Sequence, residues 1–392
     1  MRRFFVLVLV GLSLGSAAVA WGQSFSIDVG SPEITVGVSG SVGPGGLQPG
    51  EIFIPLAAFG AVAPPVAPPA LTSLIVISPG EVDGLSFGRR PPSVFIGNEP
   101  VVFSLDRSSS GLAGTASANE FNFGSGVSEQ SSDLFLSTFN ATNTLFADGD
   151  GVVQAGNPNP AAFPLGAGEF ATFPFPPGPP PPLGGADLDA VDLRANLFGP
   201  GSPTGRVFYS LDASSASAIG FSGGDVLVDP TGLGNPASVY ASEMLLEILP
   251  IGAPPGSNDI DALVVYDDGD NVFSPGGGLV SPGDFVLFSL APGSAYLGQL
   301  DPITGLAIEA GDILMDGPSA RALLGTATVG AAIFHTAESL GLRTVRQGFP
   351  SSDNLDALDV VPEPVSVLQL LLGVAVVCCR RRQIAPRVPL TH

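Results

Sequence analysis

The chain contains 392 residues with a formal net charge of −22 at pH 7, and none of its basic residues is a lysine. A chain this acidic repels phosphates, so nucleic acids and anionic lipid surfaces are disfavoured as partners. Cys378 and Cys379 lie close to the end and His335 is the one histidine before them, so the composition excludes disulfides and the usual zinc or iron sites from residues 21–360.

The first twenty residues have the layout of a secretory signal. Arg2 and Arg3 form a cationic start, residues 4–14 are an unbroken apolar or small run, and Ala18 and Ala20 are the small residues that signal peptidase requires. The alternative of a permanent anchor is weaker, because this run is too short to cross a hydrocarbon core of about 30 Å. We expect residues 1–20 to be removed, which leaves a mature chain that starts near Trp21.

Three short sequence blocks recur through the predicted ectodomain, residues 21–360. Each block alternates apolar and polar side chains or is a short apolar run after a Gly or Asp turn, which is typical of half-buried strands. The first block opens units near residues 81, 187, 259 and 353, at 81–85, 187–191, 259–263 and 354–358. The second block lies at 102–106, 208–212 and 287–291, and the third at 132–136, 224–228 and 311–315.

The repeats predict an all-β fold. Three complete units and a fourth that only begins indicate a β-propeller-like array, in which the N-terminal strand 24–28 completes the last unit. A β-sandwich or two small β-domains also use short strands with Gly and Pro turns, so both remain alternatives. Residues 319–342 alone favour a helix. The acid that opens each first block is predicted to cap a turn by accepting backbone amides two residues on.

Two acidic loops are candidate calcium sites, because carboxylates at alternate positions with glycine between them can wrap a hard cation. The candidate ligands are Asp148 and Asp150 in one loop, and Asp268, Asp270 and Asn271 in the other. Neither completes an EF-hand, since position 12 would be Asn159 or Leu279 rather than glutamate. Calcium is therefore a candidate ligand and no other cofactor is indicated, with solvated turns as the alternative interpretation.

Gly220-Phe221-Ser222-Gly223-Gly224 matches the G-x-S-x-G pattern of serine hydrolases. That pattern requires a strand before the serine and a helix after it, whereas residues 225–228 read as a strand. We interpret the segment as a glycine turn and predict no catalytic residue.

The segment after residue 360 has the layout of a sorting tail. Pro362, Glu363 and Pro364 precede an uncharged, mostly apolar stretch at 365–379, predicted to be a short helix, and Arg380, Arg381 and Arg382 follow it. Positive charge directly after an apolar stretch holds that end in the cytoplasm, so residues 384–392 are expected to be a cytoplasmic tail.

This tail, residues 361–383, resembles the PEP-CTERM sorting signal. The resemblance implies recognition and cutting by an exosortase-like membrane enzyme of a Gram-negative bacterium, a class of organism that often makes exopolysaccharide. The apolar run is short and residues 383–392 follow the arginines, where the family usually stops almost at once. The Asp-x-Asp-Ala-Leu pattern of the first block resembles repeats in other PEP-CTERM proteins of unknown role, which implies a shared scaffold. An ordinary uncut anchor is the alternative.

Together these features predict a protein that is exported through the inner membrane, anchored transiently or permanently, and placed on the cell surface or in the extracellular matrix. We expect a non-catalytic scaffold that binds exopolysaccharide or calcium. The alternative is a secreted hydrolase acting on glycans or esters.

Overall fold

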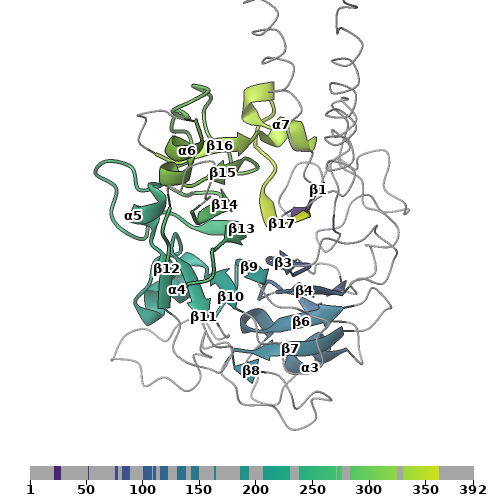
Figure 1. Ribbon diagram of the computed structural model, residues 1–392. Helices are drawn as coiled ribbons and strands as arrows, with labels where there is room; N and C mark the ends of the chain where they lie inside the picture. The colour runs from purple at the N-terminus through teal and green to yellow at the C-terminus, as the bar shows by residue number, and fades with distance from the viewer. Residues whose placement is uncertain are drawn as a thin grey trace, which may run out of the picture.

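The computed structural model has an all-β architecture with a few short helices between antiparallel strands (Figure 1). The prediction of the all-β class is therefore confirmed. The structure describes residues 22–27, 52, 76–77, 82–88, 100–107, 109–111, 115–121, 130–137, 143–149, 163–164, 186–193, 206–229, 238–270, 272–275, 283–324 and 330–361. The predicted signal and the apolar stretch 365–379 lie outside these ranges. Among the residues described, no helix is both long and apolar enough to span a membrane.

Three sheets share one plan, an antiparallel meander of four strands in chain order. Each recurrent block becomes a strand because its apolar residues can be buried on a sheet face. The first sheet contains β3 (Leu85–Ser86), β4 (Val101–Phe103), β6 (Leu134–Ser137) and β7 (Asn143–Asp148), with β8 (Phe163–Pro164) added in parallel. The second contains β9 (Ala190–Leu193), β10 (Val207–Ser210), β11 (Val226–Asp229) and β12 (Ser238–Ala241). The third contains β13 (Ile260–Tyr266), β14 (Phe285–Leu290), β15 (Ile313–Met315) and β16 (Ala332–His335).

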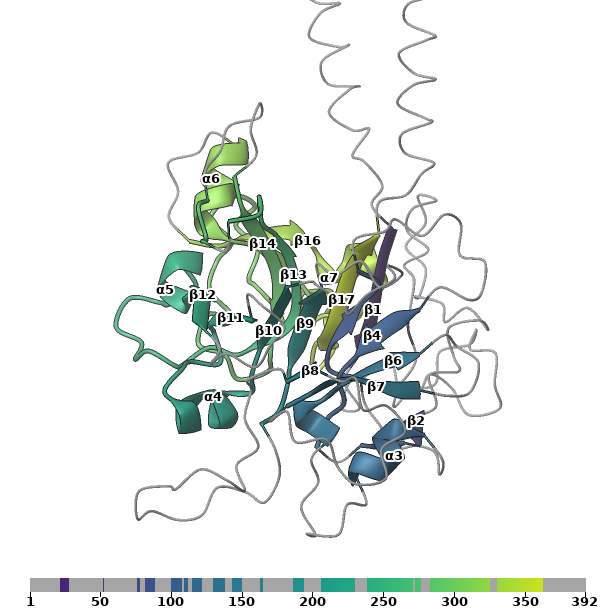
Figure 2. The same ribbon diagram turned by 60° about the horizontal axis from the view of Figure 1, so that its bottom comes forward.

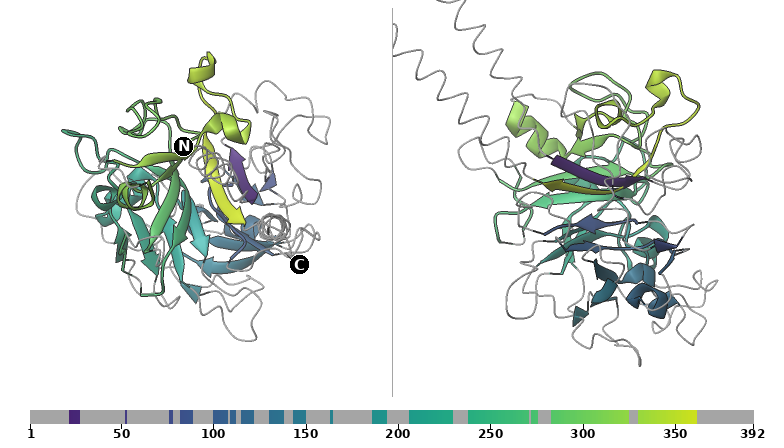
Figure 3. Two further views of the ribbon diagram at one scale, coloured as in Figure 1. Left: turned by 45° about the horizontal axis from the view of Figure 1, so that its top comes forward. Right: turned by 90° about the vertical axis from the view of Figure 1, so that its right-hand side faces the viewer.

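The fourth unit pairs the two ends of the ectodomain. Strand β1 (Gly22–Ile27) lies antiparallel to β17 (Leu355–Val361), with Gly22 opposite Val361 (Figure 3). Strand β1 also contains most of a second block, because Phe25-Ser26-Ile27-Asp28 matches Phe-Ser-Leu-Asp at 103–106. The fourth unit therefore takes its first block from one end of the ectodomain and its second block from the other.

Short helices and a small sheet fill the connections. The small sheet joins β2 (Val76–Ile77) to β5 (Ser110–Gly111). The helices are α3 (Ala116–Phe121), α4 (Ala213–Ile219), α5 (Glu243–Leu246), α6 (Gly317–Leu324) and α7 (Ala337–Leu340), with 3-10 turns at Gln130–Ser132 and Val345–Gln347. The prediction that residues 319–342 alone contain helix is wrong, because α3, α4 and α5 lie outside that range. Within the range, α6 and α7 are two separate short helices. Strand β16 separates them, because pairing with β15 outweighs a weak local preference for helix.

The first strands of the four units lie together at the centre (Figure 2). Strand β13 contacts both β9 and β17, and β3 contacts the same two strands. Four apolar clusters occupy the junctions between successive sheets. They join Tyr209 to Val102, Phe288 to Phe208, Phe25 to Leu287, and Phe103 to Ala357. Each cluster thus joins residues of two different sheets.

One hydrogen bond recurs at each of these junctions. A buried serine of a second block donates to a backbone carbonyl in the first block of the next unit. That carbonyl belongs to the residue between the two polar positions of the block. The four bonds are Ser104 to Leu188 (3.0 Å), Ser210 to Ile260 (2.8 Å), Ser289 to Leu355 (2.7 Å) and Ser26 to Val82 (2.7 Å). The last bond connects β1 to the first sheet.

Candidate functional site

Carboxylates of the first blocks gather where the first strands meet. Each first strand has two polar positions at or just before its start, and the contacts among β3, β9, β13 and β17 bring these positions together. We call five acids of the first three units the first-block carboxylates. They are Asp83, Asp187, Asp189, Asp259 and Asp261.

Asp189 and Asp259 are two of these acids whose pKa values are raised. Burial raises the pKa of Asp189 well above its ordinary value of 3.8, and the charges of the other four first-block carboxylates raise it further. Burial also raises the pKa of Asp259 to about 7, although the Ala213 amide acts in the opposite direction. Both carboxyl groups therefore favour the protonated form more than an exposed aspartate does.

A second subset lies at the junction of the first and second sheets. One oxygen each from Asp83, Asp106 and Asp187 lies within 4.8 Å of the others, and we call these three acids the junction cluster. Asp187 is 8% exposed, and burial raises its pKa although Arg107 lowers it. Oδ2 of Asp187 lies 3.4 Å from Nε of Arg107, whereas Oδ1 has no hydrogen-bond partner among the described residues.

The fourth unit contributes an amide in place of an acid. Nδ2 of Asn354 donates to Asp261 at 2.5 Å and to Asp356 at 3.0 Å. An amide donor between two carboxylates reduces their repulsion.

The acids that precede the third strands have a different environment. Asp225 accepts from the backbone amides of Ser222 and Glu243, both at 3.0 Å. Asp133 accepts from the Gly149 amide at 2.9 Å. These acids cap turns, the role that was predicted for the first-block acids. Among the first-block carboxylates, Asp259 accepts a hydrogen bond at 3.2 Å from the backbone amide of Ala213, which lies in the preceding unit.

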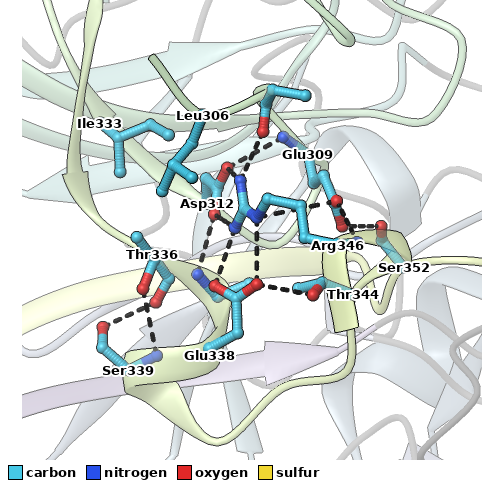
Figure 4. Close-up of polar contacts among 12 residues, drawn as sticks. Leu306, Glu309, Asp312, Ile333, Thr336, Glu338, Ser339, Thr344, Arg346 and Ser352 are labelled. Carbon is cyan, nitrogen blue, oxygen red and sulfur yellow. Dashed lines mark hydrogen bonds and ion pairs between the residues drawn. The ribbon is translucent and has the colours of Figure 1, made fainter. Parts of the chain in front are cut away.

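Asp312, the third such acid, lies in a buried ion cluster around Arg346 (Figure 4). The guanidinium of Arg346 donates to Asp312 at 2.6 and 2.7 Å and to Glu338 at 2.9 and 3.0 Å. Partial burial raises the pKa of Glu338, but hydrogen bonds from Arg346 and Thr344 more than offset it and hold the pKa at about 2. These bonds fasten the C-terminal segment to the third sheet.

The predicted calcium ligands are dispersed or already engaged. Asp148 is 3% exposed at the end of β7, whereas Asp150 and Asn271 lie outside the described residues. Asp268 is exposed, and oxygens of Asp267, Asp270 and Asp284 lie within 4.8 Å of one another. Each of these last three acids accepts hydrogen bonds. Asp267 accepts from Arg206 at 2.6 Å, Asp270 from the Val272 amide at 2.8 Å, and Asp284 from the amides of Asp268 and Ser274 at 2.8 and 2.7 Å.

The G-x-S-x-G segment is a turn between a helix and a strand, the reverse of the order that a hydrolase requires. Oγ of Ser222 accepts from the Gly224 amide at 3.1 Å. His335 lies on β16 against the ring of Phe334, and burial lowers its pKa. These contacts agree with a glycine turn.

The predicted processing residues cannot be placed in this structure. Ala18, Ala20, Pro362, Glu363 and Pro364 lie outside the described residues, as do the three arginines at 380–382. Comparison of the chain with protein-family models, curated proteins and solved structures finds no match.

The sequence alone did not single out Asp106 or Arg107. A usable signal existed, because Ser-Leu-Asp recurs at 104–106 and 210–212 and becomes Ser-Ile-Asp at 26–28. The serine of this motif bonds the next unit, so the aspartate two residues on must lie near that unit's first block.

Proposed function

We propose that this chain is an exported, non-catalytic scaffold protein of the cell surface or extracellular matrix of a Gram-negative bacterium. The observation that carries the proposal is the serine-to-carbonyl hydrogen bond repeated at four junctions. It gives a recurrent polar residue a structural role, which is to hold neighbouring sheets together. The predicted signal at 1–20 and the sorting tail at 361–383 support export and recognition by signal peptidase and an exosortase-like enzyme.

The scaffold is a propeller-like array of four units, with β1 and β17 in the last one. The serine bonds and the apolar clusters, each running from one unit to the next, support this arrangement. A further support comes from Gly50-Glu51-Ile52-Phe53-Ile54, which has the sequence of a third block. Ile52 is fully buried in the same cluster as Phe103 and Ala357. Exopolysaccharide is the partner class that the tail resemblance suggests, because a largely uncharged glycan is not repelled by an acidic surface.

Cell fractionation tests the sorting part of this proposal. Cells expressing the full chain are compared with cells expressing a chain that ends after Val361. We expect the truncated protein in the medium and the full chain on the surface, with the same release after replacing all three arginines at 380–382 by glutamine. Arg387→Gln is the matched control and should leave localisation unchanged. Surface retention of the truncated chain would contradict the proposal.

The second candidate is a secreted hydrolase acting on glycans or esters, and the pair of Asp189 and Asp259 favours it. Raised carboxyl pKa values are a feature of acid catalysts. The test is release of reducing sugar or ester product by the purified protein. Activity that Asp189→Asn abolishes in a folded variant would replace the scaffold proposal with this one.

A further inference from the structure

The junction cluster combines close carboxylates with an unsatisfied buried oxygen. Each of its three acids offers one oxygen, and these three atoms lie within 4.8 Å of one another. Asp187 is more than nine-tenths buried, yet its Oδ1 has no hydrogen-bond partner among the described residues. A buried carboxylate oxygen without a donor is costly, so an unsatisfied one indicates a partner such as a cation.

Arg107 does not supply that partner. Its Nη2 atom is held by α4 and its cap, at 2.6 Å from Ser215 Oγ and 3.2 Å from Asp212 Oδ1. Its Nε atom lies 3.4 Å from Oδ2 of Asp187 without hydrogen-bond geometry. Arg107 thus forms ion pairs with Asp187 and Asp212 but gives no hydrogen bond to Oδ1 of Asp187.

The ligand atoms define the class of cation. All three are carboxylate oxygens, which favour hard cations over zinc or copper. Calcium binds oxygen at about 2.3–2.6 Å, so two oxygens on one ion can be separated by up to about 5 Å. The spacing within the junction cluster fits inside that span. Calcium also tolerates irregular geometry better than magnesium, which suits acids that come from three different segments of chain.

The equivalent positions at other junctions lack this combination. At the junction of the second and third sheets, Asp259 accepts from the Ala213 amide and also has an oxygen without a partner, but no group of three such close acids occurs there among the described residues. At the next junction, Ala291 replaces the aspartate of the second block and Asn354 replaces the acid of the first. The loop with Asp267, Asp270 and Asp284 is already supplied with donors.

We propose that Asp83, Asp106 and Asp187 bind a calcium ion, with Oδ1 of Asp187 as the buried ligand, at the junction of the first and second sheets. The ion supplies the partner that Oδ1 of Asp187 lacks and ties strand β3 to the segment before β9. This site differs from both loops that the sequence suggested.

Titration calorimetry with calcium chloride alone tests the proposal on the purified full chain after dialysis against chelator. We expect one bound ion per chain, with a dissociation constant on the order of 10⁻⁴–10⁻³ M, as in extracellular calcium modules. Asp187→Asn and Asp106→Asn should each weaken binding about tenfold or more, equivalent to about 1.4 kcal/mol. Asp270→Asn, in the other acidic cluster, is the matched control and should bind like the parent chain.

Thermal melting separates binding from a structural role. Calcium at millimolar concentration should raise the melting temperature of the parent chain and of Asp270→Asn, but not that of Asp187→Asn. Without calcium, Asp187→Asn should melt no lower than the parent, because it removes repulsion among carboxylates. Absence of calcium binding by the parent chain would overturn the proposal. Retention of full affinity in both junction variants, or its loss in Asp270→Asn, would do the same. None of these outcomes affects the fractionation test of the scaffold proposal.

Discussion

The aspartates before the first strands and those before the third strands occupy similar sequence positions but different surroundings. Third-block acids such as Asp225 and Asp312 accept backbone amides, and Asp312 also binds Arg346. First-block acids such as Asp189 face other carboxylates. An amide or guanidinium makes a buried acid a structural anchor, whereas carboxylate neighbours leave it with charge that a proton or a cation must neutralise.

The strongest test of the anchoring role is Asp312→Ala. This change removes the acceptor of the Ala337 and Glu309 amides and one partner of the buried Arg346 charge. We expect the free energy of unfolding to fall by about 3–5 kcal/mol, as when one partner of a buried ion pair is removed. Urea denaturation measures this loss. Asp270→Ala, in an exposed loop, should cost under about 0.5 kcal/mol. A loss below about 1 kcal/mol for Asp312→Ala would show that its contacts are not anchors.

The pH dependence of stability tests the opposite role of the first-block acids. The pKa of Asp259 is about 7 when folded and its ordinary value is 3.8, so its protonation favours folding and this stability is lost between about pH 4 and 7. Glu338 behaves conversely: its folded pKa of about 2 lies below the ordinary 4.5, so its contribution is lost as pH falls from 4.5 to 2. We expect maximal stability near pH 4–5, with a decrease of about 1–3 kcal/mol by pH 8.

Chemical denaturation between pH 3 and 8 measures both effects. Asp259→Asn should flatten the curve above pH 5, and Glu338→Gln should flatten it below pH 4.5. An unchanged slope above pH 5 in Asp259→Asn would assign the pH effect to the overall charge of the chain.

The smallest effects are expected at the serines that link the sheets. Ser26→Ala and Ser289→Ala each remove one buried hydrogen bond to a carbonyl, at a cost of about 1 kcal/mol. Similar losses would support the equivalence of β1 and β14 as second strands. Ser351→Ala, an exposed position, is the control and should be neutral. A neutral result for Ser26→Ala alone would indicate that the fourth unit is held by packing.

The recurrent blocks were sufficient to predict the strands, because a period of two and a preceding turn are local properties of sequence. The convergence of Asp83, Asp187 and Asp189 could not be predicted, because it depends on how separate sheets approach one another. The turn-cap prediction does not describe Asp259, which accepts an amide from the preceding unit, for the same reason: the sequence does not say which group lies opposite. Ser104 and Arg107 were missed although the Ser-Leu-Asp pattern was visible.

The pairing of β1 with β17 imposes an order on folding during synthesis. Strand β1 emerges first, and its partner emerges only after the strands of the other sheets have been made. Those sheets can form as each is completed, since their strands are consecutive in the chain. An interrupted chain would therefore keep an unpaired edge at β1, so the last strand distinguishes a finished molecule from an unfinished one.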